Sequence, residues 1–360
     1  MRLEHLRLRQ FRNLDDAEFA FPASGVALLG DNGQGKTNLL EAIYYPVFFR
    51  SIHGASDTEL VRFGTSGFRV DAEISSRNRH HRIDVAFHPA GRRKQIERDG
   101  VAAIRLADEV GHWLAVAFLP QDLRLTAGPA AERRRYLDRM LAVADRGYYS
   151  ALANYRAAIA QRNAGLRQGR LDMARAFDGA LAAAGSHVVA TRCAWIDRAS
   201  EALAAELESL GEPGTAQMAY LGHRELADCA AWTAALNAAE ARDRQRGTTT
   251  VGPHRDDIRI VLDGHPVREF GSTGQQRSVA IALKFLELLT LERAREAPPA
   301  LLLDDVFAEL DRERQQRLAD RLGRTGERQV FLSSPRMDEL PPNLELPVWV
   351  VRSGRIALTP

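Results

Sequence analysis

A glycine-rich segment near the N-terminus has the composition of a phosphate-binding loop. Residues 30–37 read Gly-Asp-Asn-Gly-Gln-Gly-Lys-Thr, between the apolar run 26–29 and the helix-like run 38–43. Glycines at this spacing let backbone N–H groups point inward, Lys36 reaches the outer phosphates, and the Thr37 hydroxyl can coordinate Mg²⁺. A nucleoside triphosphate, ATP, is therefore the expected ligand. Its expected binding residues are Gly30, Asp31, Asn32, Gly33, Gln34, Gly35, Lys36, Thr37 and Asn38.

Two adjacent carboxylates follow a second apolar run. Residues 300–303 are continuously apolar, which is typical of a strand buried on both faces of a parallel sheet, and Asp304 and Asp305 come directly after them. We expect Asp304 to hold Mg²⁺ through water and Asp305 to orient or deprotonate the attacking water. Aspartate is shorter than glutamate, so slow turnover is expected. The alternative is that the pair caps the following helix.

A third segment pairs a hydroxyl with a helix start. Ser272, Thr273, Gly274 and Gln275 precede a long helix-like run and offer a hydroxyl and free backbone N–H groups to an anion. Because the first loop already supplies phosphate donors, this second set is best explained if it serves the nucleotide of another subunit. The alternative is a capping box, with Ser272 or Thr273 capping and Gln275 or Gln276 completing it.

The order of these segments is that of ATP-binding-cassette proteins. Gln121, after the apolar run 115–119, stands where this class has its Q-loop and would sense Mg²⁺; the alternative is a proline turn with an exposed glutamine. Residues 308–311, ending in Asp311, stand where the class has its dimer-contacting D-loop. The expected Mg²⁺ ligands are thus Thr37, Asp304 and Gln121.

The surrounding pattern predicts an α/β fold: a P-loop ATPase head with a mixed β-sheet lobe and an inserted α-helical lobe. Residues 1–127 are expected to carry the P-loop and Q-loop, 128–248 the helical lobe, and 249–360 the signature, Walker B and D-loop segments. The expected strands are 6–9, 19–21, 26–29, 68–74, 81–87, 115–119, 258–262, 267–270, 300–303, 329–332 and a final hairpin at 348–358. A helix is expected from 38–43 onward, ended or bent by Pro46, and further helices at 275–295 and 312–322.

Composition narrows the class of protein without naming a partner. The 360 residues carry a formal net charge of +2, so the overall charge does not indicate nucleic acid. Two cysteines in alanine-rich sequence argue against a disulfide framework or a zinc ribbon. No apolar stretch approaches a membrane span and the first residues lack a secretory pattern, so a cytoplasmic protein without membrane contact is expected.

Longer stretches of the amino-acid sequence resemble the RecF family of bacterial DNA repair proteins. The similar stretches are 11–14, 30–44, 132–138, 161–163, 252–257, 272–280 and 303–311. The resemblance implies a head like those of SMC and Rad50 without the long coiled coil, which forms a homodimer around two ATP molecules and binds double-stranded DNA. A weak DNA-dependent ATPase activity would reset this clamp. By the same resemblance Arg12 and Asn13 touch the phosphates, while Ser272, Gly274 and Gln275 contact the partner's γ-phosphate.

The family also implies partners. It acts with RecR and RecO at junctions of duplex and single-stranded DNA and helps RecA load onto gaps. Two features depart from the sequence pattern of these proteins. Ser333-Ser334-Pro335 stands where cassette proteins often have a switch histidine, and the sequence of segment 45–53 differs from that expected for the family. The DNA-contacting residues are not assigned, because the basic clusters 92–94 and 133–135 are equally compatible with solvated surface or internal ion pairs. The alternatives in other classes are the ATPase subunit of a membrane transporter and a nucleotide-dependent recruitment scaffold.

Overall fold

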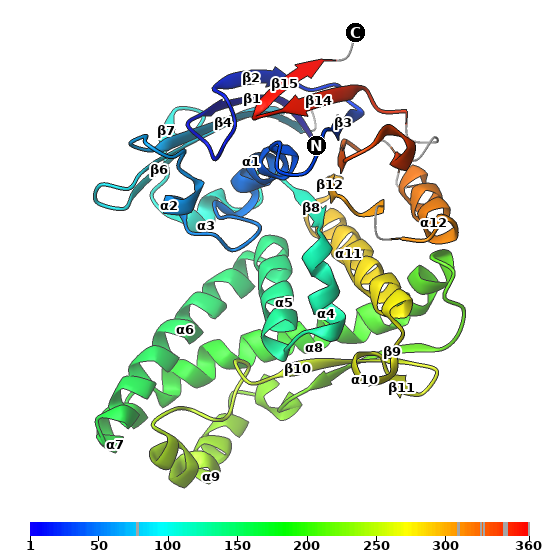
Figure 1. The fold of residues 1–360 in the computed structure, drawn as a ribbon. Coiled ribbons are helices and arrows are strands. Elements are labelled where there is room, and N and C mark those ends of the chain that lie inside the picture. Colours follow the sequence, from blue (N-terminus) through cyan, green and yellow to red (C-terminus); the bar gives the residue numbers. More distant parts are fainter. Residues whose placement is uncertain (77–78, 308–309, 325, 327, 341–344, 359–360) are drawn as a thin grey trace. The chain divides into compact units, whose positions relative to one another are not determined.

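The computed structural model describes residues 1–76, 79–307, 310–324, 326, 328–340 and 345–358, and the chain folds into two compact units (Figure 1). We call 1–122, 209–211 and 287–360 the core unit, and 123–208 and 212–286 the helical unit. The expected division at 248 differs from this one, because the strands near residue 260 pair with a strand near residue 218 and so belong to the helical unit.

The core unit contains a six-stranded sheet that positions the phosphate-binding loop. Its order is β15-β14-β3-β13-β12-β8, with β14, β3, β13, β12 and β8 parallel. These strands are β3 (Gly25–Leu29), β8 (Ala115–Phe118), β12 (Ala300–Asp304), β13 (Val330–Ser334), β14 (Val348–Arg352) and β15 (Arg355–Leu358). All residues of β8, β12 and β13 are buried, which explains their continuous apolar runs and confirms the buried strand expected at 300–303.

A second, antiparallel sheet of the core unit has the order β2-β1-β4-β5-β6-β7. Its strands are β1 (Arg2–Arg9), β2 (Ala17–Ala20), β4 (Phe68–Ser76), β5 (Arg79–His88), β6 (Arg93–Arg98) and β7 (Val101–Ala102). Arginines alternate with buried leucines along β1, so one face is apolar. Phe21 stacks on Trp349 with ring centroids 5.0 Å apart and meets Phe331 edge-on at 5.1 Å, which joins the segment after β2 to β14 and β13.

Short helices complete the core unit. They are α1 (Lys36–Phe48), α2 (Asp57–Leu60), α3 (Leu106–Glu109), η1 (Pro120–Leu123), α12 (Arg312–Gly323) and η4 (Met337–Glu339). Pro46 does not end α1, as one alternative expected: the helix continues to Phe48 and stops at Phe49, whose left-handed backbone donates its N–H to the carbonyl of Tyr45.

The helical unit follows the helical periodicity of its sequence, with one small sheet. Its helices are α4 (Arg124–Ala127), α5 (Ala130–Ala144), α6 (Arg146–Arg167), α7 (Leu171–Arg175), α8 (Asp178–Ser209), η2 (Arg224–Ala227), α9 (Ala231–Arg246) and α10 (Val267–Phe270). The sheet has the order β11-β10-β9, with β9 (Ala216–Leu221), β10 (Asp257–Leu262) and β11 (His265–Pro266). Helix α11 (Thr273–Arg295) begins in this unit and ends in the core unit.

Two local predictions in the helical unit are wrong. The stretch expected to be helical contains β9, whose alternating burial is that of a half-exposed strand paired with β10. The strand expected at 267–270 is helix α10, and the strand after the Asp263-Gly264 turn is limited to the two residues of β11, because Pro266 has no N–H to continue the pairing. In the described part of the chain the fold has no long coiled coil. Within the same ranges, no helix is both long and apolar enough to cross a membrane.

Candidate nucleotide-binding site

The glycine-rich loop joins β3 to α1 and leaves the start of that helix open. Gly35 is the N-cap of α1 at φ +119°, and no side chain caps the helix. The first N–H groups of a helix have no partner within it, so at this end they are available to an anion. Gly30 has φ +158°, and a Cβ there would lie 2.3 Å from the carbonyl oxygen of Val351 in β14. Only glycine fits at that position.

Lys36 spans this loop with its side chain almost completely buried, at 4% exposure. Its ammonium group donates hydrogen bonds to the backbone oxygens of Gly30 at 2.6 Å and Asp31 at 3.2 Å. The charge therefore lies across the loop, next to the uncapped helix end. Lysine serves as a point charge toward phosphate, and this placement fits that chemistry.

Thr37 and Asp304 are brought together at the carboxyl end of β12. The Thr37 hydroxyl donates to Asp304 Oδ1 at 2.9 Å, and Asp304 is buried. Burial raises the pKa of Asp304 above its ordinary value, whereas the hydrogen bonds that Ser333 and Thr37 donate favour the ionised form. A hydroxyl and a carboxylate are hard oxygen ligands of the kind Mg²⁺ takes beside nucleotide phosphates, so these two residues fit the metal.

Ser333 contacts the carboxylates of both Asp304 and Asp305. It lies opposite Asp304 in the register of β13 with β12. Its Oγ is 2.7 Å from Asp304 Oδ1 and 3.2 Å from Asp305 Oδ1, and it accepts a hydrogen bond from the Asp305 N–H at 3.0 Å. Asp305 has φ +49°, so Ser333 fixes a backbone turn that aspartate seldom adopts. Sequence reasoning noted this serine only as a departure from a histidine.

Gln121 is held by a histidine that sequence reasoning did not select. Gln121 Nε2 lies 3.1 Å from His53 Nδ1, and Oε1 lies 3.4 Å from the same atom. His53 comes from segment 45–53, whose sequence differs from that typical of the family. That difference was the one feature of the sequence that could have drawn attention to His53.

Arg12 and Asn13 differ in their relation to the loop. Asn13 Oδ1 accepts a 2.7 Å hydrogen bond from the Asn38 side chain, and Asn13 Nδ2 lies 3.4 Å from the Gly33 oxygen, so Asn13 borders the loop. Arg12 instead donates from Nε to the fully buried carboxylate of Glu41 at 2.8 Å. The guanidinium of Arg12 therefore has a structural partner already.

The turn between β14 and β15 fixes the side of the loop opposite Lys36. The Ser353 N–H donates to Gln34 Oε1 at 2.6 Å, and the Gly354 N–H donates to the Gln34 oxygen at 2.8 Å. A Cβ on Gly354 would lie 2.0 Å from the Asn13 oxygen. No local pattern could have indicated this contact, because it depends on β14 lying beside β3.

In the helical unit, Ser272 and Gln275 form the capping box that was one of the two alternatives. Ser272 Oγ accepts from the Gln275 N–H at 3.2 Å, and Gln275 Oε1 accepts from the Ser272 N–H at 3.0 Å. Ser272 and Thr273 are both exposed, and Gly274 follows them in α11. The capping geometry and the exposed tip are compatible with each other. Contact with a second copy's nucleotide stays a prediction.

The expected D-loop lies only partly within the described residues. Asp311 is the N-cap of α12, and its side chain accepts from the Arg314 N–H at 2.9 Å. Ala308 and Glu309 lie outside the described residues.

The two basic clusters are partly internal. Lys94 pairs with Asp57 at 2.6 Å and donates to the Phe49 oxygen. Arg133 is buried and pairs with Asp257 at 2.6 Å. Arg135 pairs with Glu132 at the surface. Lys94 and Arg133 therefore have structural roles, which removes one residue from each candidate DNA footprint.

The parallel sheet order and the placement of Lys36, Thr37 and Asp304 define a P-loop ATPase head of the ATP-binding-cassette type. Residues 2–341 match the family described as "RecF/RecN/SMC N terminal domain". The chain belongs to the RecF family. It is 36% identical over 368 residues to the "DNA replication and repair protein RecF" of Citrifermentans bemidjiense, covering 99% of this chain and 100% of that protein. The protein of the same name from Synechococcus sp. is 35% identical, covering 89% and 88% of the two chains.

Solved structures agree with the sequence comparison. The "recombination mediator protein RecF-ATP in RecFOR pathway" superposes with a TM-score of 0.91 at 27% identity, over 99% of this chain and 97% of that chain. The structure described as RecF-ATPrS gives 0.90 at the same identity. An Smc head domain from Pyrococcus furiosus gives 0.58 at 16% identity, which shows the shared fold alone.

Proposed function

We propose that this protein is an ATP-dependent DNA-binding protein of recombinational repair. On this proposal it dimerises on ATP on duplex DNA near single-strand gaps, and it aids RecA loading together with RecR and RecO in the cytoplasm. Slow, DNA-dependent ATP hydrolysis resets it. The observation that carries the proposal is the joining of Lys36, Thr37 and Asp304 at one end of a parallel sheet, in a chain whose full-length relatives are named for DNA replication and repair.

The chemistry of the site follows from its residues. The α1 N–H groups and Lys36 bind the phosphates, and Thr37 and Asp304 would hold Mg²⁺. When bound, Mg²⁺ neutralises phosphate charge. Asp305 orients or deprotonates the attacking water, and Ser333 keeps its carboxylate and backbone in place. Gln121 would sense the metal. Asn13 borders the phosphates, and Arg12 reaches them only if its ion pair with Glu41 opens.

On this proposal, a second copy of the protein completes each ATP-binding site. Ser272, Thr273, Gly274 and Gln275 of one protomer contact the γ-phosphate held by the other, and Asp311 lies at the dimer contact. The exposure of Ser272 and Thr273 at the start of a helix supports this assignment, since such a tip offers a hydroxyl and N–H groups to an anion.

Light scattering and mixing experiments test the proposal. The expected result is that the mass doubles with ATP and Mg²⁺, and that duplex DNA binds more tightly with ATP than without it. Lys36→Ala removes phosphate binding and Ser272→Arg removes the trans contact, so neither variant hydrolyses ATP alone. Mixed, they restore one intact composite site per dimer and part of the activity. An unchanged mass at saturating ATP, together with no rescue on mixing, contradicts the proposal.

A further inference from the structure

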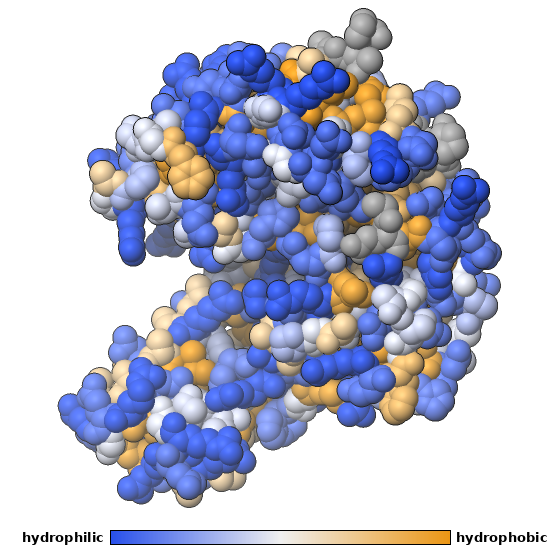
Figure 2. Space-filling model, viewed as in Figure 1, coloured by the Kyte–Doolittle hydropathy of each residue, from blue (hydrophilic) through white to orange (hydrophobic). Residues whose placement is uncertain are grey.

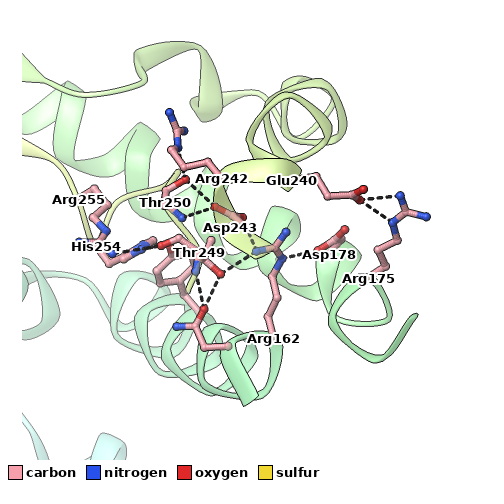
Figure 3. A network of polar contacts seen from close by, with 12 residues as sticks. Arg162, Arg175, Asp178, Glu240, Arg242, Asp243, Thr249, Thr250, His254 and Arg255 are labelled. Carbon is pink, nitrogen blue, oxygen red and sulfur yellow. Dashed lines mark hydrogen bonds and ion pairs between the residues drawn. The ribbon is translucent and has the colours of Figure 1, made fainter. Parts of the chain in front are cut away.

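A buried polar network in the helical unit holds the loop between α9 and β10. Arg162 of α6 donates to Asp178, to Asp243 and to the Thr249 hydroxyl, each at 2.8 Å. The Asn163 side chain accepts both the N–H and the hydroxyl of Thr249 at 2.7 Å. Figure 3 shows Arg162, Asp243 and Thr249 converging on this loop. The network lies outside the candidate nucleotide site, and none of its groups is used in the proposed hydrolysis.

His254 fixes the other end of the same loop. Its Nε2 donates to the Thr249 oxygen at 2.9 Å, and its Nδ1 accepts from the Tyr155 hydroxyl at 2.6 Å. Burial lowers the pKa of His254 to about 4, and the nearby charges of Arg255 and Arg134 act in the same direction. The loop is therefore held at both ends by buried side chains.

Three arginines project from this frame without a carboxylate partner. Arg242 Nε donates to the Thr250 hydroxyl at 2.8 Å, and Arg255 lies 3.4 Å from the Thr249 oxygen. Arg246 is exposed and lies one helical turn from Arg242 on the same face of α9. Across the described ranges no acidic group lies within ion-pair distance of these three guanidinium groups.

Three acidic groups around this frame already have partners. Asp178 and Asp243 pair with Arg162, and Glu240 pairs with Arg175 at 2.6 Å. Arg242 and Arg255 therefore meet only uncharged acceptors on the loop. An anion is the missing partner of such a cluster.

We propose that Arg242, Arg246 and Arg255 bind backbone phosphates of duplex DNA. This assignment rests on the proposed function and locates its DNA contact. The exposed residues of 242–246 are arginine and glutamine, and Gly247 and three threonines follow them, so the surface offers charge and hydrogen-bond donors without apolar side chains. Protein interfaces have an aromatic or aliphatic centre, whereas DNA interfaces are polar and positively charged. The end of the helical unit that carries α7 and α9 is mainly hydrophilic in the space-filling view (Figure 2).

The test uses the full chain, a labelled duplex and a salt series from about 50 to 200 mM. The triple variant Arg242→Ala/Arg246→Ala/Arg255→Ala is compared with Arg175→Ala. Arg175 is an exposed arginine of the same unit that is already paired with Glu240. Each lost phosphate contact lowers the slope of log affinity against log salt by about 0.9, and at 0.1 M salt it weakens binding about 8-fold. The triple variant should therefore lose about 2.7 units of slope, and Arg175→Ala should lose almost none.

Folding and the nature of the ligand are controlled separately. The triple lysine variant keeps the charges and should keep most of the slope, while ATP affinity and circular dichroism stay those of the unchanged protein in all variants. If the alanine triple does not fold, each single alanine variant should lose about 0.9 units of slope. The assignment is overturned if the alanine variants bind the duplex with the affinity and salt slope of the wild type. It is also overturned if they bind the duplex normally and lose affinity only for single-stranded DNA or for an acidic peptide. Failure of the unchanged protein to bind duplex DNA with ATP refutes the proposed function itself.

Discussion

Thr37 and Asp304 lie 267 positions apart in the sequence, yet the hydroxyl of one donates to the carboxylate of the other at 2.9 Å. The contact forms because β3 and β12 are both parallel strands on either side of β13, so their carboxyl ends meet at one edge of the sheet. A hydroxyl and a carboxylate from opposite ends of the chain thereby become one oxygen cluster beside Lys36.

Ser333 should control hydrolysis without controlling ATP affinity. Ser333→Ala removes the hydroxyl that contacts Asp304 and accepts the Asp305 N–H, so the Asp305 carboxylate loses its fixed position. We expect kcat to fall about 10-fold, the size of a hydrogen bond to a charged group, with the Kd for ATP unchanged. Ser333→Thr keeps the hydroxyl and should restore the rate. Single-turnover hydrolysis and equilibrium ATP binding measure the two quantities; a loss of affinity equal to the loss of rate would refute this role.

Two substitutions of Ser272 should separate its role in helix capping from its role in dimerisation. Ser272→Asp retains an N-cap acceptor for the Gln275 N–H but places a carboxylate where the partner's phosphate is expected. We therefore expect unchanged thermal stability and no ATP-dependent doubling of mass. Ser272→Ala loses the cap and should cost about 1 kcal/mol of stability. Calorimetry and light scattering on both variants provide the check, and a normal ATP-bound dimer of Ser272→Asp would show that Ser272 only caps α11.

Arg12→Ala should mainly lower the stability of the core unit, and its effect on phosphate binding must be measured separately from that loss. The Glu41 carboxylate has no solvent exposure, and its ion pair with Arg12 has a distance of 2.8 Å. Removing one partner of a buried pair costs about 3 kcal/mol or more, because the other charge is left without compensation. The double variant Arg12→Ala/Glu41→Gln should recover most of the loss in urea unfolding. ATP affinity measured in that double variant then reports the phosphate role of Arg12 alone.

His254 should make the stability of the helical unit fall in mild acid. Its folded pKa of about 4 lies below the value of about 6.5 in an unfolded chain, so the unfolded state binds the proton first as the pH falls. The neutral histidine contributes fully above pH 6.5, and the contribution is lost between about pH 6.5 and 4. Between pH 7.5 and 5 the expected loss is about 2 kcal/mol. His254→Gln can keep both hydrogen bonds without titrating, so the urea midpoint of the unchanged protein should fall relative to that of the variant as the pH is lowered; parallel curves would contradict the prediction.

The sequence was sufficient for the parts of the site that are local. Some patterns can be recognised from neighbouring residues alone, such as the glycine spacing around Lys36 and the two carboxylates after an apolar run. The loop, β12 and the cap at Ser272 were therefore predictable. The contacts between segments were not, because they depend on strand order: Ser333 beside Asp304, and the β14–β15 turn beside Gln34. Strand β9 was missed because most of its six residues, Ala-Gln-Met-Ala-Tyr-Leu, are good helix formers like the sequence around them.

The position of β3 has a consequence for how the protein is made. Both neighbours of this strand, β13 and β14, come from the last part of the chain, and the turn at Ser353 and Gly354 completes the fixing of Gln34. A nascent chain that has passed residue 300 on the ribosome still has β3 without a partner on either side. On the proposed function, the phosphate-binding loop after β3 gains its full support only once β13 and β14 have been made.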